Sequence, residues 1–133
     1  DGASVAFDMA DLIYVNAGAT RPTDSWLDRL SNGGRLVLPL TATGLLRPDD
    51  PPNMQQRGAV FVIERSGEAF LARWISGVAI YPCVGSRDEA SERALANAMR
   101  KGAGKCVTRL FRTDNLPDER CWLRGPGWCL AYE

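Results

Sequence analysis

Small and polar residues that could line a ligand site follow two apolar runs in the first third of the chain. Residues 12–15 form the first run and lead into 16–20, where most side chains are small; residues 36–40 form the second and lead into Thr41. If the two runs are neighbouring parallel strands, their carboxyl ends meet at one edge of a sheet, where α/β proteins bind ligands. Small residues there let the backbone approach a bound molecule closely.

The 133-residue chain contains no histidine. This excludes Ser-His-Asp and Cys-His catalysis and removes the commonest metal ligand. The 4 cysteines show neither CxxC nor zinc-finger spacing, so we predict no metal site and expect buried, reduced, structural thiols. A disulfide between Cys121 and Cys129 is the alternative. No catalytic residue can be assigned, and a reaction here must rely on carboxylates, hydroxyls, backbone groups or alignment of the reactants.

Charge and hydropathy exclude several kinds of partner. Lys plus Arg and Asp plus Glu are equal at 16 each, so we expect no nucleic acid and no membrane as partner. No apolar run reaches the roughly 18 residues that a membrane span needs, and no signal peptide opens the chain. We therefore predict a cytoplasmic protein with the size of one domain.

Apolar runs separated by turn residues predict an α/β fold. Residues 12–15 show no polar alternation, which favours a strand buried on both faces. Thr23 or Asp24 can cap a short helix, which the Gly-Gly pair at 33–34 ends before the strand at 36–40. A strand–helix–strand unit of this kind is right-handed and parallel in nearly all cases.

The rest of the chain predicts a hairpin, a longer helix and further strands. Residues 41–58 form a long loop, either a lid or a plain surface excursion. Strands at 59–64 and 68–83 flank a Ser-Gly turn, and a bulge is expected at Ser76–Gly77. The later elements are a helix with a capping box at 86–89 and its end at Gly102, a strand at 106–111, an irregular stretch at 115–127 and a closing strand at 128–132.

Several segments together resemble the second half of the protein-L-isoaspartate O-methyltransferase family, whose members use S-adenosylmethionine and a Rossmann-like sheet. The matching segments are 1–2, 7–8, 11–19, 26–27, Leu30, 33–40 and 77–82. Gly-Gly-Arg-Leu followed by apolar residues and Pro, at this distance after an aspartate-led strand, is the most specific part. The resemblance implies the C-terminal half of a methyltransferase core in residues 1–83, an incomplete sheet with parallel strands plus an antiparallel hairpin. Residues 84–133 would form a helix-strand C-terminal extension packed on the same domain.

The resemblance also implies where a site would lie. The residues expected along the cofactor are Asp1, Gly2, Asn16, Ala17 and Gly18. Those expected in the substrate pocket are Ala19, Thr20, Thr41 and Tyr81. In the family, the acid that Asp1 matches contacts the adenine end of S-adenosylmethionine. From the residues alone, Asp1 could equally be a polar chain end, the small loop could be the packing of a strand end, and Tyr81 could be a core aromatic.

The chain departs from the family because it contains no Gly-x-Gly-x-Gly cofactor loop. The family's first strand, its ribose-binding acid and its acceptor-side serine would all lie before residue 1. We therefore expect a fragment that is inactive alone, and that belongs to an S-adenosylmethionine-dependent methyltransferase acting on a carboxylate, as in isoaspartyl proteins. Its expected partners are the missing N-terminal half and, through an exposed strand edge, a second copy of itself. The alternatives are a non-catalytic interaction domain derived from a methyltransferase and an unrelated α/β binding domain.

Overall fold

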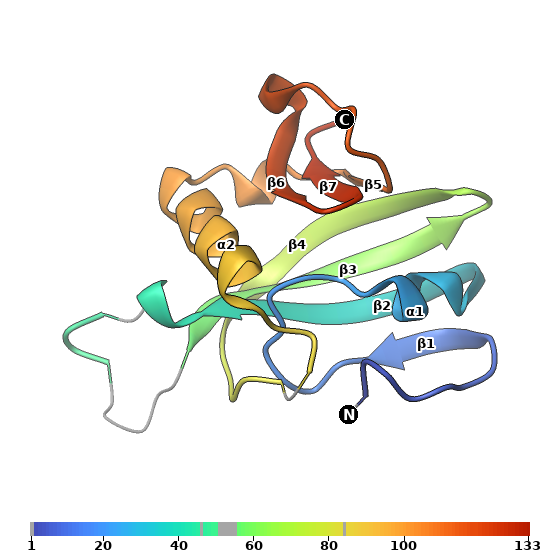
Figure 1. The fold of residues 1–133 in the computed structure, drawn as a ribbon, viewed down its shortest axis with the longest axis horizontal. Helices are drawn as coiled ribbons and strands as arrows, with labels where there is room; N and C mark the ends of the chain where they lie inside the picture. Colours follow the sequence, from blue (N-terminus) through green and yellow to red (C-terminus); the bar gives the residue numbers. More distant parts are fainter. Residues whose placement is uncertain (1, 46, 51–55, 84) are drawn as a thin grey trace.

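The computed structural model describes residues 2–45, 47–50, 56–83 and 85–133, which form one seven-stranded mixed sheet with two α-helices (Figure 1). The strands are β1 (Ala10–Tyr14), β2 (Leu30–Ala42), β3 (Arg57–Ser66), β4 (Ala69–Ala79), β5 (Arg109–Phe111), β6 (Cys121–Gly125) and β7 (Trp128–Ala131). The helices are α1 (Asp24–Asp28) and α2 (Glu89–Lys101). The strand order is β1-β2-β3-β4-β5-β7-β6, so the predicted α/β class is confirmed.

Strands β1 and β2 are parallel neighbours, with Tyr14 opposite Val37 and Leu12 opposite Arg35. Helix α1 connects them, as the sequence pattern predicted. The remaining strand pairs of the described residues are antiparallel. Strand β1 therefore lies at one edge of the sheet. The side of β1 that faces away from β2 has no strand beside it in the part of the chain that the structure describes.

The sheet is covered on one face, not on both. Alternate residues of β2 and β3 point into the core, where α1 and α2 also place their apolar residues; the core includes Leu36, Leu38, Phe61, Ile63, Trp26 and Leu95. On the opposite face, Leu12 is 61% and Tyr14 65% exposed. The prediction that residues 12–15 are buried on both faces is therefore wrong for β1. Its apolar run reflects a surface that the described residues leave open.

Two predicted helix boundaries are wrong. Thr23 is the N-cap of α1, since its Oγ1 accepts from the Trp26 N–H, but the helix ends at Asp28 with Arg29 as its C-cap. The Gly-Gly pair at 33–34 lies inside β2. Helix α2 begins two residues later than the capping-box pattern indicated, because its N-cap is Asp88, which accepts from the Ser91 N–H, and not Ser86. Its predicted end at Gly102 is confirmed.

Strands β3 and β4 form the predicted hairpin around Ser66 and Gly67, whose positive φ of 63° suits glycine. The pairing moves from Val60 opposite Ser76 to Phe61 opposite Trp74, so the extra residue of the bulge is Ile75. The prediction had placed it at the next two positions. Within the predicted loop at 41–58, residues 46 and 51–55 lie outside the described residues. The loop is shorter than predicted, because β2 runs to Ala42 and β3 begins at Arg57; a 3₁₀ turn occupies Thr43–Leu45.

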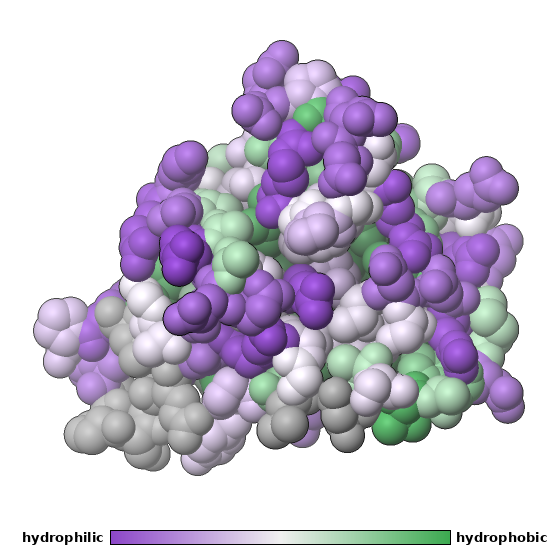
Figure 2. All heavy atoms as spheres, in the orientation of Figure 1, coloured by the Kyte–Doolittle hydropathy of each residue, from purple (hydrophilic) through white to green (hydrophobic). Residues whose placement is uncertain are grey.

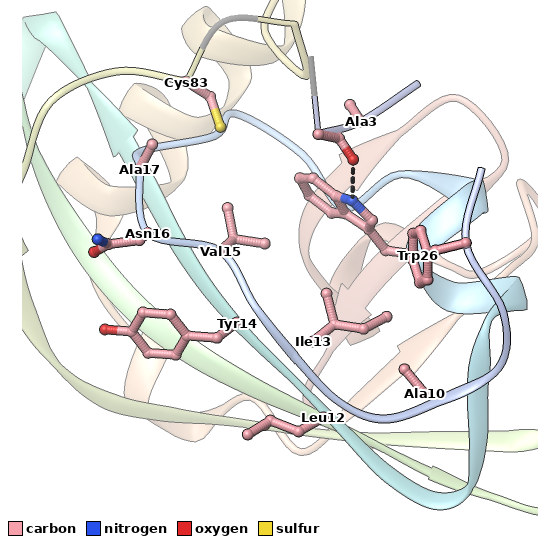
Figure 3. Close-up of a pocket in the computed structure, with 12 residues that line it drawn as sticks. Ala3, Ala10, Leu12, Ile13, Tyr14, Val15, Asn16, Ala17, Trp26 and Cys83 are labelled. Atoms are coloured by element: carbon pink, nitrogen blue, oxygen red, sulfur yellow. Dashed lines mark hydrogen bonds between the residues drawn. The ribbon is translucent and has the colours of Figure 1, made fainter. Parts of the chain in front are cut away.

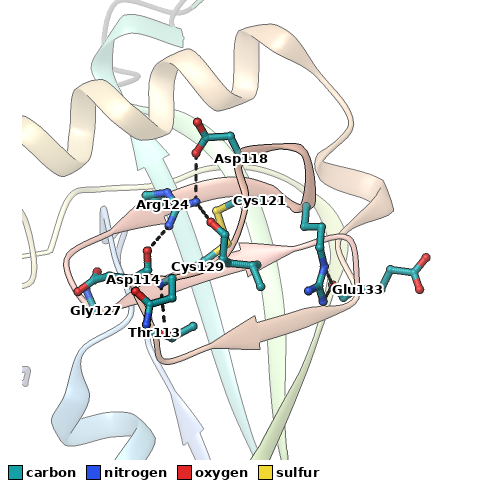
Figure 4. Close-up of a disulfide and its surroundings, with 11 residues drawn as sticks. Thr113, Asp114, Asp118, Cys121, Arg124, Gly127, Cys129 and Glu133 are labelled. Carbon is teal, nitrogen blue, oxygen red and sulfur yellow. Dashed lines mark hydrogen bonds and ion pairs between the residues drawn. A yellow bond between two sulfur atoms is a disulfide. The ribbon is translucent and has the colours of Figure 1, made fainter.

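The C-terminal strands extend the same sheet beyond β4. The predicted strand at 106–111 is reduced to β5, and the stretch predicted as irregular at 115–127 contains β6. A disulfide joins Cys121 to Cys129 across β6 and β7 (Figure 4). The expectation of four reduced, buried cysteines is therefore wrong, and Cys106, one of the two free thiols, is exposed.

On the side of the molecule that Figure 2 shows, hydrophilic side chains gather over α2 and the C-terminal strands. Apolar side chains gather at the lower right, over β1 and the segment leading into it. No helix in the described ranges is both long and apolar enough to cross a membrane.

Candidate functional site

A groove of about 440 Å³ runs along β1 and is lined mainly by apolar side chains (Figure 3). The lining residues are Gly2, Ala3, Phe7, Ala10, Leu12, Ile13, Tyr14, Val15, Asn16, Ala17, Trp26 and Cys83. Figure 3 shows Ile13 and Val15 pointing toward Trp26, while Leu12 and Tyr14 point away from it. The groove thus combines an apolar wall with the edge of a strand.

The backbone of β1 leaves hydrogen-bonding groups at this edge. The Val15 N–H donates to the Val37 carbonyl at 3.0 Å, and Tyr14 is the residue opposite Val37. In a parallel strand, alternate residues direct both backbone groups to the same neighbour. Ile13 and Val15 therefore face β2, and Leu12 and Tyr14 turn their N–H and C=O groups outward. An unpaired edge of this kind can accept another strand.

The N-terminal segment is held against α1 at the far end of the groove. Trp26 Nε1 donates to the Gly2 carbonyl at 3.1 Å, and Ser25 Oγ donates to the Ala3 carbonyl at 2.9 Å. Gly2 and Asn16 therefore line the same groove although 14 positions separate them in the sequence. Asp1, the predicted adenine contact, lies outside the described residues.

The loop after β1 is tied down by its own backbone. The Gly18 N–H donates to the Tyr81 carbonyl and the Cys83 N–H donates to the Gly18 carbonyl, both at 2.7 Å. The Ala19 N–H donates to the Pro39 carbonyl at 2.9 Å. A Cβ added to Gly18 would lie 1.9 Å from Thr41 Oγ1. The small side chains here serve close packing between the ends of β1 and β2.

Arg87 closes the carboxyl ends of the two parallel strands. Its Nη1 donates to the Gly18 carbonyl at 2.7 Å, and its Nη2 donates to the Thr41 carbonyl at 3.1 Å and lies 3.3 Å from Glu92. Burial lowers the pKa of Arg87, against the opposing attraction of Glu92. The N–H of Thr43, which donates to Glu92, lowers the pKa of that carboxyl. The cluster is a paired, mostly buried cross-link between α2 and the strand ends.

The predicted site residues divide into two groups. Gly2, Asn16 and Ala17 line the groove, so the structure brings three predicted cofactor residues together. The others lie apart from that groove: Gly18, Ala19, Thr20 and Thr41 are buried, while Tyr81 is 65% exposed. Tyr81 is therefore not the core aromatic that was considered, and Thr20 is buried with its Oγ1 2.6 Å from Ser91 Oγ. A ligand in the groove reaches the first group and not the buried residues of the second.

Sequence reasoning missed Arg87 and the groove-lining Cys83. The pattern at 86–89 was interpreted as a helix cap, and no local signal shows that its arginine spans to residues 18 and 41. Burial raises the pKa of the Cys83 thiol, with Arg87 opposing, so this cysteine is not an activated nucleophile. In the described segments, no cluster of three or more metal-ligating side chains occurs.

Similarity to known proteins is found among solved structures. No family model matches the sequence, and no curated protein matches it. Among solved structures, the chain is similar to a protein-L-isoaspartate O-methyltransferase with a TM-score of 0.47 and 16% sequence identity, over 82% of this chain and 30% of that chain. This chain therefore spans less than a third of the length of that protein.

Proposed function

We propose that this chain is the C-terminal half of the sheet of an S-adenosylmethionine-dependent methyltransferase, and that it functions only when a second half completes the sheet along β1. The observation that carries the proposal is the groove beside the open β1 edge. It brings Gly2, Asn16 and Ala17, the accessible part of the expected cofactor set, next to the position that a further strand would occupy.

The parallel pair of β1 and β2 supports this proposal. Tyr14 and Val37 are adjacent and parallel, as a Rossmann-like sheet requires at these two positions. Leu12 and Tyr14 are exposed on the same sheet face, and a parallel sheet is normally covered on both faces. A partner half would supply both the neighbouring strand and the missing cover.

The chain alone is proposed to be inactive because it lacks the glycine-rich loop with which the family it resembles holds the cofactor. Its sequence contains no Gly-x-Gly-x-Gly segment. The backbone N–H groups of Gly18, Ala19 and Thr20 donate to protein carbonyls and are not available to a ligand. The cradle for the cofactor must therefore come from the second half.

In the completed enzyme, S-adenosylmethionine would supply the transferable methyl group. A carboxylate acceptor is anionic at neutral pH and needs no general base. The rate of methyl transfer would therefore depend on the alignment of the acceptor oxygen, the methyl group and the sulfur. That requirement is compatible with a chain that has no histidine. The residues of this chain would exclude water from one wall of the groove and orient the cofactor through Asn16 and Ala17.

The competing proposal is a non-catalytic interaction domain that uses the same edge. It is favoured by the 61% and 65% exposure of Leu12 and Tyr14, since exposed apolar strand edges associate with other strands. On this account, the chain pairs with a second copy or another protein, and no cofactor binds at any stage.

Calorimetric titration with S-adenosylmethionine separates the two proposals. We expect no saturable heat with the 133-residue chain and saturable binding with the polypeptide translated from the complete gene. In that polypeptide, Ala17→Leu should abolish binding by filling the groove, whereas Ala69→Leu, at the exposed start of β4, should leave it unchanged. Binding by the isolated chain, or none by the complete polypeptide, would overturn the methyltransferase proposal.

A further inference from the structure

A hollow of about 400 Å³ lies where the end of α2 and the 3₁₀ turn after β2 meet the start of β3 and the end of β4. The described residues that shape it include Leu45, Arg47, Arg57, Trp74, Gly77 and Met99. None of the described residues that line it also lines the β1 groove. Its volume is that of a small-molecule site, and its walls combine apolar, aromatic and cationic side chains.

Gly77 keeps the floor of the hollow open. Trp74 lies opposite Phe61 and Gly77 lies opposite Ala59, and both partners belong to the core, so positions 74 and 77 share the sheet face that α2 covers. Gly77 is nevertheless exposed. The nearest atom to a Cβ built on Gly77 is the Gly58 carbonyl oxygen, 3.9 Å away. A larger side chain at position 77 would therefore project into the hollow.

Trp74 supplies an aromatic wall whose position is fixed from behind. Its ring meets Phe61 edge-on, with the ring centroids 5.6 Å apart and the planes at 72°. A Cβ built on Gly104 would lie 2.7 Å from Trp74 Cζ3, so the backbone at Gly104 also packs tightly against the indole. The side chain is still only partly buried, and it lines the hollow. These contacts orient the indole and leave part of it for a planar ligand to pack against.

Two arginines provide donors in the same hollow. Arg57 Nε donates to Asp50 Oδ2 at 2.8 Å and its Nη2 donates to Oδ1 at 2.5 Å, while 32% of the Arg57 side chain stays exposed. This pair leaves the Nη1 hydrogens of Arg57 without a partner among the described residues. The Arg47 side chain is exposed and makes no hydrogen bond or ion pair with the described residues. Both guanidinium groups can therefore donate to a ligand.

The cationic wall is held in place before any ligand arrives. Asp50, whose side chain is 7% exposed, also accepts from the Arg47 N–H at 2.6 Å. The hydrogen bond from Arg57, followed by that from the Arg47 N–H, lowers the pKa of Asp50 to about 2, so the carboxylate stays ionised and paired at neutral pH. Arg100 Nη2 donates to the Gly44 carbonyl at 2.9 Å and fastens the 3₁₀ turn to α2. Such preorganisation reduces the entropic cost of binding.

We propose that this hollow binds a small molecule in which an aromatic ring carries a phosphate group. The ring lies above Gly77 and packs against Trp74, and the phosphate oxygens accept from Arg47 and from Arg57 Nη1. A phosphate ester carries about two negative charges at neutral pH, which suits two arginines better than the single charge of a carboxylate. The proposal is independent of the methyltransferase proposal, because it concerns a different part of the surface.

The test is a titration of the 133-residue chain with 1-naphthyl phosphate, followed through the ¹⁵N–¹H signal of the Trp74 indole. We expect a saturable shift of this signal. 1-Naphthol lacks the phosphate and inorganic phosphate lacks the ring, so each should bind roughly tenfold more weakly or worse. Equal affinity for either compound, or no saturable shift with 1-naphthyl phosphate, would overturn the proposal. 1-Naphthoate binding as tightly would overturn the phosphate assignment.

Two pairs of variants locate the site. Arg47→Gln should weaken binding of 1-naphthyl phosphate roughly tenfold, whereas Arg93→Gln removes the same charge from the exposed surface of α2 and should not change it. Gly77→Leu should abolish binding by filling the hollow. Ser76→Leu places the same bulk on the opposite face of β4 and should leave binding unchanged.

The unfolding midpoint separates loss of the site from loss of the fold. Arg47→Gln removes a side chain without a partner among the described residues, and Gly77→Leu extends into open space, so neither should lower the midpoint. Equal losses of affinity in the Arg47 and Arg93 variants, or undiminished binding by Gly77→Leu, would overturn the proposed site. These outcomes do not depend on whether S-adenosylmethionine binds to this chain or to the polypeptide from the complete gene.

Discussion

Replacing Gly18 by alanine would place a methyl group inside the packed carboxyl ends of β1 and β2. The new Cβ would lie 1.9 Å from Thr41 Oγ1 and 3.0 Å from Thr41 Cβ. Thr41 cannot turn away easily, because it is β-branched and fully buried, and its Oγ1 donates to Gln56 at 2.8 Å. The structure must therefore move Thr41 or separate the two strand ends.

Overpacking of this kind costs about 1–3 kcal/mol in the free energy of unfolding. Urea denaturation followed by the fluorescence of the 4 tryptophans measures it. Gly77→Ala is the matched control, since the nearest atom to its added Cβ is 3.9 Å away, an ordinary contact. Combining Gly18→Ala with Thr41→Ala, which removes Oγ1, should give a loss smaller than the sum of the two single losses by about 1 kcal/mol.

The opposite result has a clear meaning. Neutral surface substitutions change the free energy of unfolding by up to about 0.5 kcal/mol. If the free energies of unfolding of Gly18→Ala and Gly77→Ala differ by no more than this, Gly18 is not packed against Thr41. The small loop would then be free to approach a ligand, as the sequence alone suggested.

Three further predictions follow from other parts of the fold. The hydrogen bond that the Thr43 N–H donates to Glu92 lowers the pKa of this carboxyl in the folded protein. The stability that Glu92 contributes is therefore present above its pKa in the unfolded chain and is lost as the pH falls through its pKa in the folded protein. The stability difference between the unmodified protein and Glu92→Gln should shrink below about pH 4.5 and not above it. Replacing Cys121 and Cys129 with serine opens a loop with a separation of 8 residues and should cost about 2–3 kcal/mol by loop-closure entropy in urea denaturation; an unchanged midpoint under reduction would contradict the pairing. The isolated chain should self-associate in sedimentation velocity, and Leu12→Lys should make it monomeric; a monomeric parent chain would count against an interacting edge.

The β1–α1–β2 unit and the β3–β4 hairpin could be predicted because their signals are local. Two apolar runs around a capped helix define the first, and a Ser-Gly turn between strand-like runs defines the second. Thr23 as the N-cap of α1 and Gly102 as the end of α2 were likewise readable from residue type. The exposure of β1 could not be predicted, because an apolar run indicates that a strand is suited to burial and does not show whether anything covers it.

The features that the sequence did not predict depend on contacts between segments that are distant in the chain. Arg87 binds Gly18 and Thr41, which lie 69 and 46 residues away, and no local pattern encodes such a pair. Strand β6 sits in a stretch rich in turn residues, where pairing with β7 and the Cys121–Cys129 bond override a weak strand signal. The Gly-Gly pair at 33–34 was interpreted as a helix stop, whereas Gly33 has a positive φ of 80° at an irregular start of β2.

Hydrogen exchange at the backbone of β1 tests the central proposal most directly. In dilute isolated chain, the Leu12 and Tyr14 amides should exchange fast, while the Val15 amide, which donates to Val37, should be protected. In the polypeptide translated from the complete gene, a further parallel strand should protect the Leu12 and Tyr14 amides as strongly as Val15, with or without S-adenosylmethionine. Fast exchange at both amides in a polypeptide that binds the cofactor would contradict the account.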